Sequence, residues 1–187
     1  MVIILSSINA VNAALTLILA ACILCPAASG VSGPSHAVGS SPDNWWIEYP
    51  YQHLNAGSAV DHPSWALDAL KEKPVIILIH QNGCHACALQ EAAIGKVLEG
   101  LGDDVAYIDI LVNDDLEKGW TALQAYDPSG DPRFVPLTVF LTLAPGPDGN
   151  VTVAWHSVVN NQNEGWIRSY LNDAIDLYRE NSEGWIR

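Results

Sequence analysis

The chain has 187 residues, of which 49% are hydrophobic and 16% are charged, and its formal net charge is −13 at pH 7. This length and this hydrophobic content are enough for one globular domain and an additional segment. The negative charge argues against nucleic acid and anionic lipid headgroups as partners, because like charges repel. We therefore predict that the chain has no nucleic-acid partner.

The first 30 residues carry no Lys, Arg, Asp or Glu, and the stretch Ala13–Ala28 is nearly all apolar. This stretch is shorter than the roughly 20 residues that cross a bilayer, and its length fits the core of a signal peptide. Leu19–Cys22 also resembles a lipobox, in which Cys22 would carry lipid, and the lack of Lys or Arg before the core leaves a retained anchor open. We predict a signal peptide or a membrane or lipid anchor over residues 1–30. The protein is then extracytoplasmic, either secreted or anchored to the outer face of the cell membrane.

Residues 31–61 are rich in Gly, Ser, Pro and Asn, which is typical of a linker. Four aromatic residues interrupt this polar composition, namely Trp45, Trp46, Tyr49 and Tyr51. We expect this aromatic cluster to pack on the domain that follows. The alternative is a patch that faces a substrate or a membrane interface.

From residue 62 to residue 180 the pattern predicts a single domain, and residues 181–187 are predicted as a tail. The expected elements, in chain order, are a helix over Trp65–Lys71, a strand over Val75–Ile79, a helix up to Leu101, a strand over Val105–Leu111, a helix over Leu116–Tyr126, strands over Leu137–Leu143 and Val151–Trp155, and a helix over Glu164–Tyr178. A helix joins the first two strands, so they are expected to be parallel. The turn Pro145–Asn150 predicts an antiparallel hairpin, and hence a mixed sheet with helices on both faces. Within the third helix, Trp120 and Leu123 are expected on the inner face.

The chain has four cysteines, and two of them, Cys84 and Cys87, lie between a buried strand and a helix. A cysteine at a helix N-terminus faces unpaired backbone N–H groups and the positive end of the helix dipole, which favour the thiolate. Such sites lower the pKa of a cysteine to about 3.5–7.5, and the thiolate is the nucleophile in disulfide exchange. The spacing predicts that Cys84 attacks a substrate disulfide and that Cys87 resolves the mixed disulfide. His85, between them, would further stabilise the Cys84 thiolate.

A single CxxC motif has two other interpretations, half of a zinc site and a structural disulfide. Zinc usually takes four protein ligands, and the chain after residue 30 holds no second CxxC motif, because Cys22 and Cys25 lie inside the apolar N-terminal stretch. The position of the pair at the start of a helix favours the redox interpretation over both.

The chain from about residue 62 to residue 180 resembles the thioredoxin superfamily. The resemblance rests on Pro74–Ile79, Gly83–Cys87 and Phe134–Thr138. It implies a thioredoxin-like three-layer α/β/α sandwich with a central mixed sheet. It also implies that the Val135–Pro136 peptide bond is cis, that Pro136 faces the cysteines, and that these two residues hold the substrate chain through its backbone.

The chain departs from the pattern of classical thioredoxins near the second cysteine. Leu78 stands where that pattern has a buried aspartate, and on an approximate alignment Tyr107 stands where it has a lysine. The resemblance therefore does not extend to the residues that accompany the reducing activity of a classical thioredoxin. His80, four residues before Cys84, either replaces the missing proton carrier or is a polar cap at the end of its strand.

Together these features predict a thiol–disulfide oxidoreductase, with no cofactor, that exchanges disulfides with exported proteins or with a membrane or soluble redox partner. One alternative is a copper-binding module on the same fold, since two thiolates suit Cu(I) and His80, His85 or His156 could add a nitrogen ligand. A second alternative is a non-catalytic interaction domain whose disulfide is structural.

Overall fold

The computed structural model describes residues 35–131 and 134–185. The segment predicted as a signal peptide or anchor, residues 1–30, lies outside the described residues. The described part contains the following elements: α1 (Ser64–Leu70), β1 (Val75–His80), α2 (His85–Leu101), β2 (Ala106–Leu111), α3 (Leu116–Tyr126), β3 (Leu137–Pro145), β4 (Val151–Val159), α4 (Glu164–Asn181) and the 3-10 turn η1 (Ser182–Gly184). Among the described helices, none combines the length and the apolar character that a membrane crossing requires.

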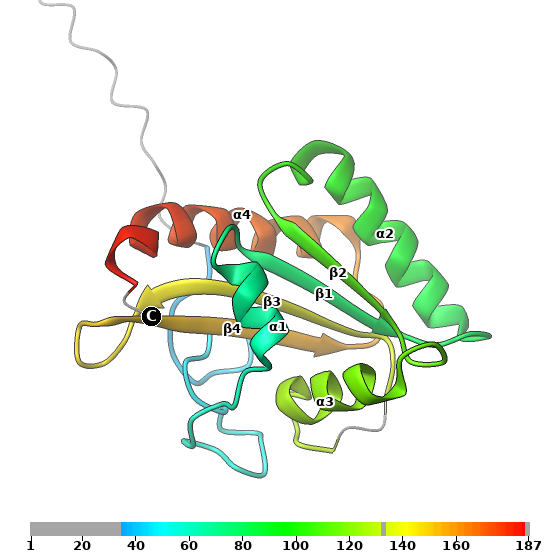
Figure 1. Ribbon diagram of the computed structural model, residues 1–187, viewed down its shortest axis with the longest axis horizontal. Helices are drawn as coiled ribbons and strands as arrows, with labels where there is room; N and C mark the ends of the chain where they lie inside the picture. The colour runs from blue at the N-terminus through cyan, green and yellow to red at the C-terminus, as the bar shows by residue number, and fades with distance from the viewer. Residues whose placement is uncertain (1–34, 132–133, 186–187) are drawn as a thin grey trace, which may run out of the picture. The chain divides into compact units, whose positions relative to one another are not determined.

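The four strands form one mixed sheet in the order β2-β1-β3-β4 (Figure 1). β1 pairs with β2 in parallel, and β3 pairs antiparallel with both β1 and β4. The predicted parallel pair and hairpin are therefore confirmed. β4 continues past its predicted end at Trp155, because the polar residues that follow are satisfied inside the protein. The hydroxyl of Ser157, for example, donates to the carbonyl oxygen of Tyr126 at 2.6 Å.

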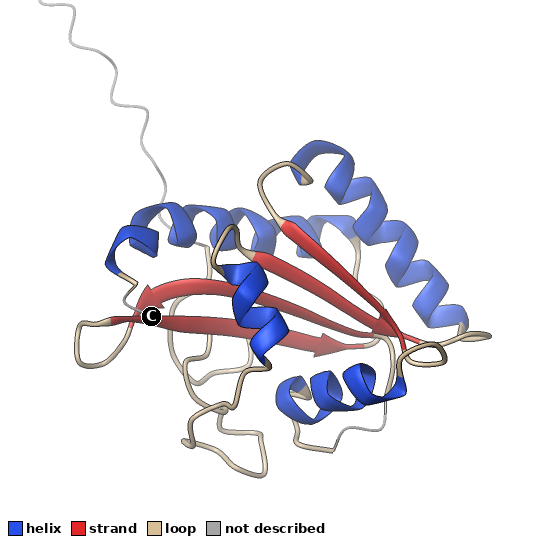
Figure 2. Cartoon of the chain, in the orientation of Figure 1, coloured by secondary structure: helices blue, strands red, loops and turns tan. Residues whose placement is uncertain are grey.

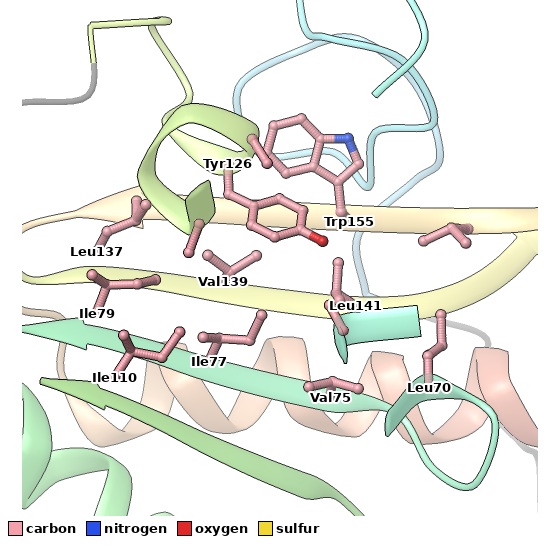
Figure 3. Packing of buried hydrophobic residues seen from close by; sticks show 14 of the residues in the cluster. Leu70, Val75, Ile77, Ile79, Ile110, Tyr126, Leu137, Val139, Leu141 and Trp155 are labelled. Atoms are coloured by element: carbon pink, nitrogen blue, oxygen red, sulfur yellow. The ribbon is translucent and has the colours of Figure 1, made fainter. Parts of the chain in front are cut away.

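Helices cover both faces of the sheet (Figures 1 and 2), as the alternation of side chains along the strands requires. Val75, Ile77 and Ile79 of β1 belong to the core under α1 and α3, whereas Ile76 and Leu78 belong to the core under α2 and α4. Figure 3 shows the first of these cores. The element order, the strand order and the three layers are those of a thioredoxin-like α/β fold, which confirms the predicted fold class.

The inner face of α3 differs from the prediction. Leu123 is buried, but Trp120 is 47% exposed, so its expected position was wrong. The buried positions of this helix, apart from Ala125, follow the spacing Gly119, Ala122, Leu123 and Tyr126. A Cβ atom at Gly119 would lie 3.0 Å from a methyl group of Val112, so the helix approaches the preceding loop too closely for a large residue. Trp120 lies one position beyond this stripe and turns toward solvent.

The residues before α1 add to the core. Trp45 and Trp46 are 0% and 1% exposed and pack into the two cores on opposite faces of the sheet. Trp46 exchanges two backbone hydrogen bonds with Trp155 of β4, at 2.7 and 2.8 Å. Tyr51, in contrast, is 62% exposed. The regular elements thus begin near residue 64, whereas the packed structure includes much of the segment predicted as a linker.

A buried carboxylate holds the beginning of this segment. Asp173 of α4 accepts hydrogen bonds from the backbone N–H groups of Ser35 and His36 at 2.7 and 2.8 Å. The ring Nδ1 of His36 lies 2.7 Å from the same carboxylate, and the ring stacks on Tyr170. This contact attaches residues 35–46 to the α4 side of the domain.

Candidate functional site

The two cysteines lie at the turn from β1 into α2 and form a disulfide. The turn passes through Gly83, whose φ of 74° is a conformation that favours glycine. Cys84 is the N-cap residue of α2, and its Sγ accepts a hydrogen bond from the backbone N–H of Cys87 at 3.1 Å. Cys84 is half-buried, whereas Cys87 is 1% exposed. Of the two cysteines, Cys84 is therefore the one that is partly exposed to solvent.

The loop before β3 approaches the disulfide from a distant part of the sequence. The Val135–Pro136 peptide bond is cis, as the resemblance implies. The carbonyl oxygen of Val135 lies 3.8 Å from the Sγ of Cys84, and the carbonyl of Pro136 accepts a hydrogen bond from the backbone N–H of Asn160. The structure thus brings Val135 to Cys84 and ties the loop to the residue that follows β4.

A pocket of about 640 Å³ opens beside the disulfide, and Cys84, Cys87, His80 and Asp109 are among the residues that line it. His80, at the end of β1, is 9% exposed. Its Nε2 lies 2.8 Å from the Oδ1 of Asp109, without the alignment of a hydrogen bond. The hydroxyl of Tyr107 donates to the same oxygen at 3.3 Å, and burial raises the pKa of this tyrosine, which keeps it protonated.

The register of β1 and β2 changes the expected surroundings of the second cysteine. Leu78 is fully buried, and the residue that pairs with it across the sheet is Asp109. Tyr107, which the sequence aligns with the lysine of the family pattern, pairs with Ile76. A carboxylate is therefore present at this site, on the neighbouring strand, and it faces His80.

His85 is the first residue of α2 and is exposed. It does not line the pocket beside the disulfide. Among the described residues, its side chain has no hydrogen-bond or ion-pair partner. The structure places it next to Cys84 in the chain and in contact with solvent.

Gln90 is a site residue that the sequence reasoning missed. It is fully buried on the inner face of α2. Its Nε2 donates to the Oγ1 of Thr138 at 2.8 Å, and its Oε1 accepts from the backbone N–H of Gln162 at 2.6 Å. Gln90 thus links the cysteine-bearing helix to the start of β3, two residues after the cis bond. An amide among the apolar positions Cys87, Ile94 and Val97 was the signal that could have revealed it.

A search of residues 35–131 and 134–185 finds no group of three or more His, Cys, Asp or Glu side chains that could hold a metal ion. Of the histidines considered for copper, His80 faces Asp109, and His156 is buried against Trp46 and Tyr170. His156 lines a different pocket from the cysteines.

No protein-family model matches the sequence, and no curated protein matches it. Solved structures of thioredoxins align with the chain at low similarity. A mutant thioredoxin of Halobacterium salinarum NRC-1 is 20% identical over 63% of this chain and 89% of that chain, with a TM-score of 0.42. The thioredoxin of Malassezia sympodialis is 17% identical over 59% and 85%, with a TM-score of 0.41. The oxidized mitochondrial thioredoxin 3 of Saccharomyces cerevisiae is 14% identical over 59% and 88%, with a TM-score of 0.40.

The assignment of this chain rests on its own topology and its own site. The strand order, the parallel β1–β2 pair and the β3–β4 hairpin define a thioredoxin-like domain. Its CxxC disulfide lies at the start of α2 and is consistent with thiol–disulfide exchange with protein partners.

Proposed function

We propose that the protein is a thiol–disulfide oxidoreductase that acts on client proteins through Cys84 and Cys87. The observation that carries this proposal is the asymmetry of the disulfide. Cys84 is partly exposed at a helix N-terminus, and Cys87 is buried one turn later. Such an arrangement suits exchange chemistry, because a client can attack or be attacked at one sulfur only.

In the oxidising direction, a client thiolate attacks the Sγ of Cys84, the Cys84–Cys87 bond breaks, and Cys87 leaves as a thiolate that takes up a proton. A second client thiolate then attacks the client sulfur of the mixed disulfide, and Cys84 leaves. In the reducing direction, the Cys84 thiolate attacks a client disulfide and one client thiolate leaves. Cys87 then loses its proton and attacks the Sγ of Cys84, which releases the second client thiolate.

Three further residues are proposed to act with the cysteines. Val135 and Pro136 hold the client backbone, since the Val135 carbonyl lies 3.8 Å from the reactive sulfur. His85 stabilises the Cys84 thiolate at the start of α2, where the helix dipole acts in the same direction.

His80 is proposed as the group that exchanges a proton with Cys87. A thiol that is 1% exposed cannot readily lose its proton to bulk water and needs a nearby acceptor. His80 lines the same pocket as Cys87, and its Nε2 lies 2.8 Å from the Oδ1 of Asp109. A pocket of this size also admits water that can carry the proton between the two groups.

We also propose that the exchange takes place outside the cytoplasm, with exported proteins or with a membrane or soluble redox partner. The uncharged and apolar stretch Ala13–Ala28 supports this compartment. Such compartments are oxidising, and disulfides form and persist in them.

Trapping of the mixed disulfide tests the proposed function. The Cys87→Ser variant of the full chain, which also carries Cys22→Ser and Cys25→Ser, is incubated with a protein substrate that contains a disulfide. We expect a covalent adduct through Cys84, seen by intact mass and removed by a reductant. The matched Cys84→Ser variant, whose remaining Cys87 is buried, is expected to form none. Equal adducts, or none from either variant, would contradict the proposal and favour the non-catalytic interaction domain.

A further inference from the structure

A groove leads away from the disulfide along α2 and β2. Its first part is the pocket of about 640 Å³ that contains Cys84 and Cys87. Its second part is a hollow of about 450 Å³ that shares Ala88, Glu91 and Asp109 with the first. The two parts therefore adjoin at these residues, and we call them together the α2–β2 groove. In Figure 1, α2 lies beside β2, the strand at this edge of the sheet.

The shape of the groove suits an extended chain. On the α2 side its second part is lined by Glu91 and by three small residues spaced by one helical turn each, Ala88, Ala92 and Gly95. Their lack of bulk leaves space between the helix and Tyr107 on β2, which is 40% exposed.

The charge of the groove is negative. Its lining contains four carboxylates, those of Glu91, Asp109, Asp114 and Asp115, and one permanent cation, Lys118. The ammonium group of Lys118 lies 4.9 Å from the centre of the Trp65 ring, a cation–π contact that engages it elsewhere.

Two of these four carboxylates interact with neighbouring groups of the protein, and the other two do not within its described part. Asp109 faces His80, and Asp115 caps α3 by accepting from the backbone N–H of Lys118. Within the described part of the chain, the side chains of Glu91 and Asp114 form no hydrogen bond and no ion pair. Their charges are therefore free to act on whatever occupies the groove.

We propose that the α2–β2 groove binds an extended client segment that carries Lys or Arg close to the reacting cysteine. This inference rests on the proposed function and specifies its substrate class. The cation compensates the uncommitted charges of Glu91 and Asp114 beside the disulfide. Anionic segments are repelled, both by the groove and by the net charge of −13.

Three peptide thiols of one length provide the test, with the single cysteine flanked by two Lys, two Gln or two Glu residues. The oxidised full chain with Cys22→Ser and Cys25→Ser reacts with each peptide. Each rate is divided by that of the same peptide with 2-hydroxyethyl disulfide, an uncharged reagent, to remove differences in intrinsic thiol reactivity. At low salt we expect the Lys peptide to react about ten times faster than the Glu peptide. At about 0.5 M salt the ratio should fall to about two, because the charges are screened.

Two double variants that change the net charge equally locate the effect. The groove variant combines Glu91→Gln with Asp114→Asn. The control combines Glu72→Gln with Glu180→Gln, two exposed residues that do not line the groove. We expect the groove variant to reduce the tenfold preference to about threefold and the control variant to keep most of it.

The possible outcomes separate the two proposals. Exchange at equal rates with all three peptides overturns the inference and leaves the proposed function intact. An equal loss of preference in both double variants also overturns it, because the effect then comes from the net charge of the protein. No exchange with any peptide overturns the proposed function itself.

Discussion

The two edge strands of the sheet, β4 and β2, have different surroundings. At the β4 edge, Trp46 pairs through its backbone with Trp155, and Asp173 anchors the residues that lead to it. At the β2 edge, none of the described residues forms a further strand, and an acidic groove runs beside the strand to the disulfide. The closed edge buries aromatic side chains, whereas the open edge exposes charged ones.

The residues that stabilise the fold at the β4 edge are therefore different from those that take part in disulfide exchange. Trp45, Trp46 and Trp155 bury large apolar surfaces away from the cysteines, and such burial is the main favourable term in folding. The cysteine site, which follows the end of β1, needs solvent access for Cys84 and a pocket that admits water for proton exchange. Substitutions at the closed edge should therefore change the free energy of unfolding, and those near the disulfide should change the rate of exchange.

The largest expected effect is on the stability of the closed edge. Replacement of Trp46 by Ala removes a fully buried side chain and leaves a cavity, which should lower the free energy of unfolding by about 3–5 kcal/mol. Chemical denaturation followed by circular dichroism measures this loss. The exchange rate of the molecules that remain folded should stay within about twofold of wild type, because sites that share no partners act independently.

Trp120→Ala is the matched control, since this tryptophan is 47% exposed on α3. It should cost less than about 1 kcal/mol. Equal losses from the two tryptophans would mean that residues 35–46 do not belong to the core in solution, and the contrast between the two edges would then be lost.

The second effect is a loss of stability in acid that arises at the closed edge. Burial lowers the pKa of His156 from 6.5 to about 4, and the neutral ring donates its Nδ1–H to the carbonyl of Asn44. The unfolded chain binds the proton first as the pH falls. The contribution of His156 to the free energy of unfolding is therefore fully present above about pH 6.5. It decreases by about 3 kcal/mol between that pH and about pH 4.

His156→Phe keeps an aromatic ring between Trp46 and Tyr170 and removes the titration. Its free energy of unfolding should fall by about 3 kcal/mol less than that of wild type between about pH 7 and pH 4. Part of the acid dependence remains in this variant, because burial also lowers the pKa of His62 to about 4. If the free energy of unfolding depends on pH in the same way in the variant and in wild type, His156 is not a buried neutral group.

The third effect concerns the rate of disulfide exchange at the cysteine site. His80→Asn should slow the attack of Cys87 on a mixed disulfide at Cys84 by about 100-fold, the range of a lost general base. The measurement is the rate at which a preformed mixed disulfide with 2-nitro-5-thiobenzoate releases its coloured thiolate, followed across pH. Attack on Cys84 by an external thiol serves as the internal control and should change little. An unchanged rate and pH profile would exclude His80 as the proton acceptor.

The smallest effect is expected at Gln90, where one substitution should change both the free energy of unfolding and the rate of disulfide exchange. Gln90→Ala leaves Thr138 and the N–H of Gln162 without their partner and should cost about 1–3 kcal/mol. Because this amide connects α2 to the start of β3, the variant should also exchange disulfides more slowly. Thr142→Val removes a buried hydrogen bond to Ala174 at a similar cost but away from the cysteines. Similar exchange rates in the two variants would show that Gln90 does not position the loop.

Local patterns predicted most of the regular structure. The apolar run of β1, the turn before β4 and the CxxC spacing are short-range signals, and the elements they indicate are present. The expected position of Trp120 was wrong because hydrophobicity was given more weight than the close approach of Gly119 to Val112, which only the packed structure shows.

Long-range pairing accounts for what the sequence could not show. The register that places Asp109 beside Leu78 depends on how two strands separated by α2 align. The sequence predicted that the aromatic cluster packs on the domain, but the pairing of Trp46 with Trp155 depends on β4, which lies far along the chain. Gln90 acquires its role only when Thr138 and Gln162 reach it from two other parts of the chain.

The reduction potential of the Cys84–Cys87 pair tests the central claim most directly. The full chain with Cys22→Ser and Cys25→Ser is equilibrated in thiol–disulfide buffers, its free thiols are alkylated, and intact mass reports the oxidised fraction. We predict a reversible two-electron transition between about −270 and −120 mV, the range of enzymes that exchange disulfides. A pair that stays oxidised below about −300 mV, as structural disulfides do, would contradict the account.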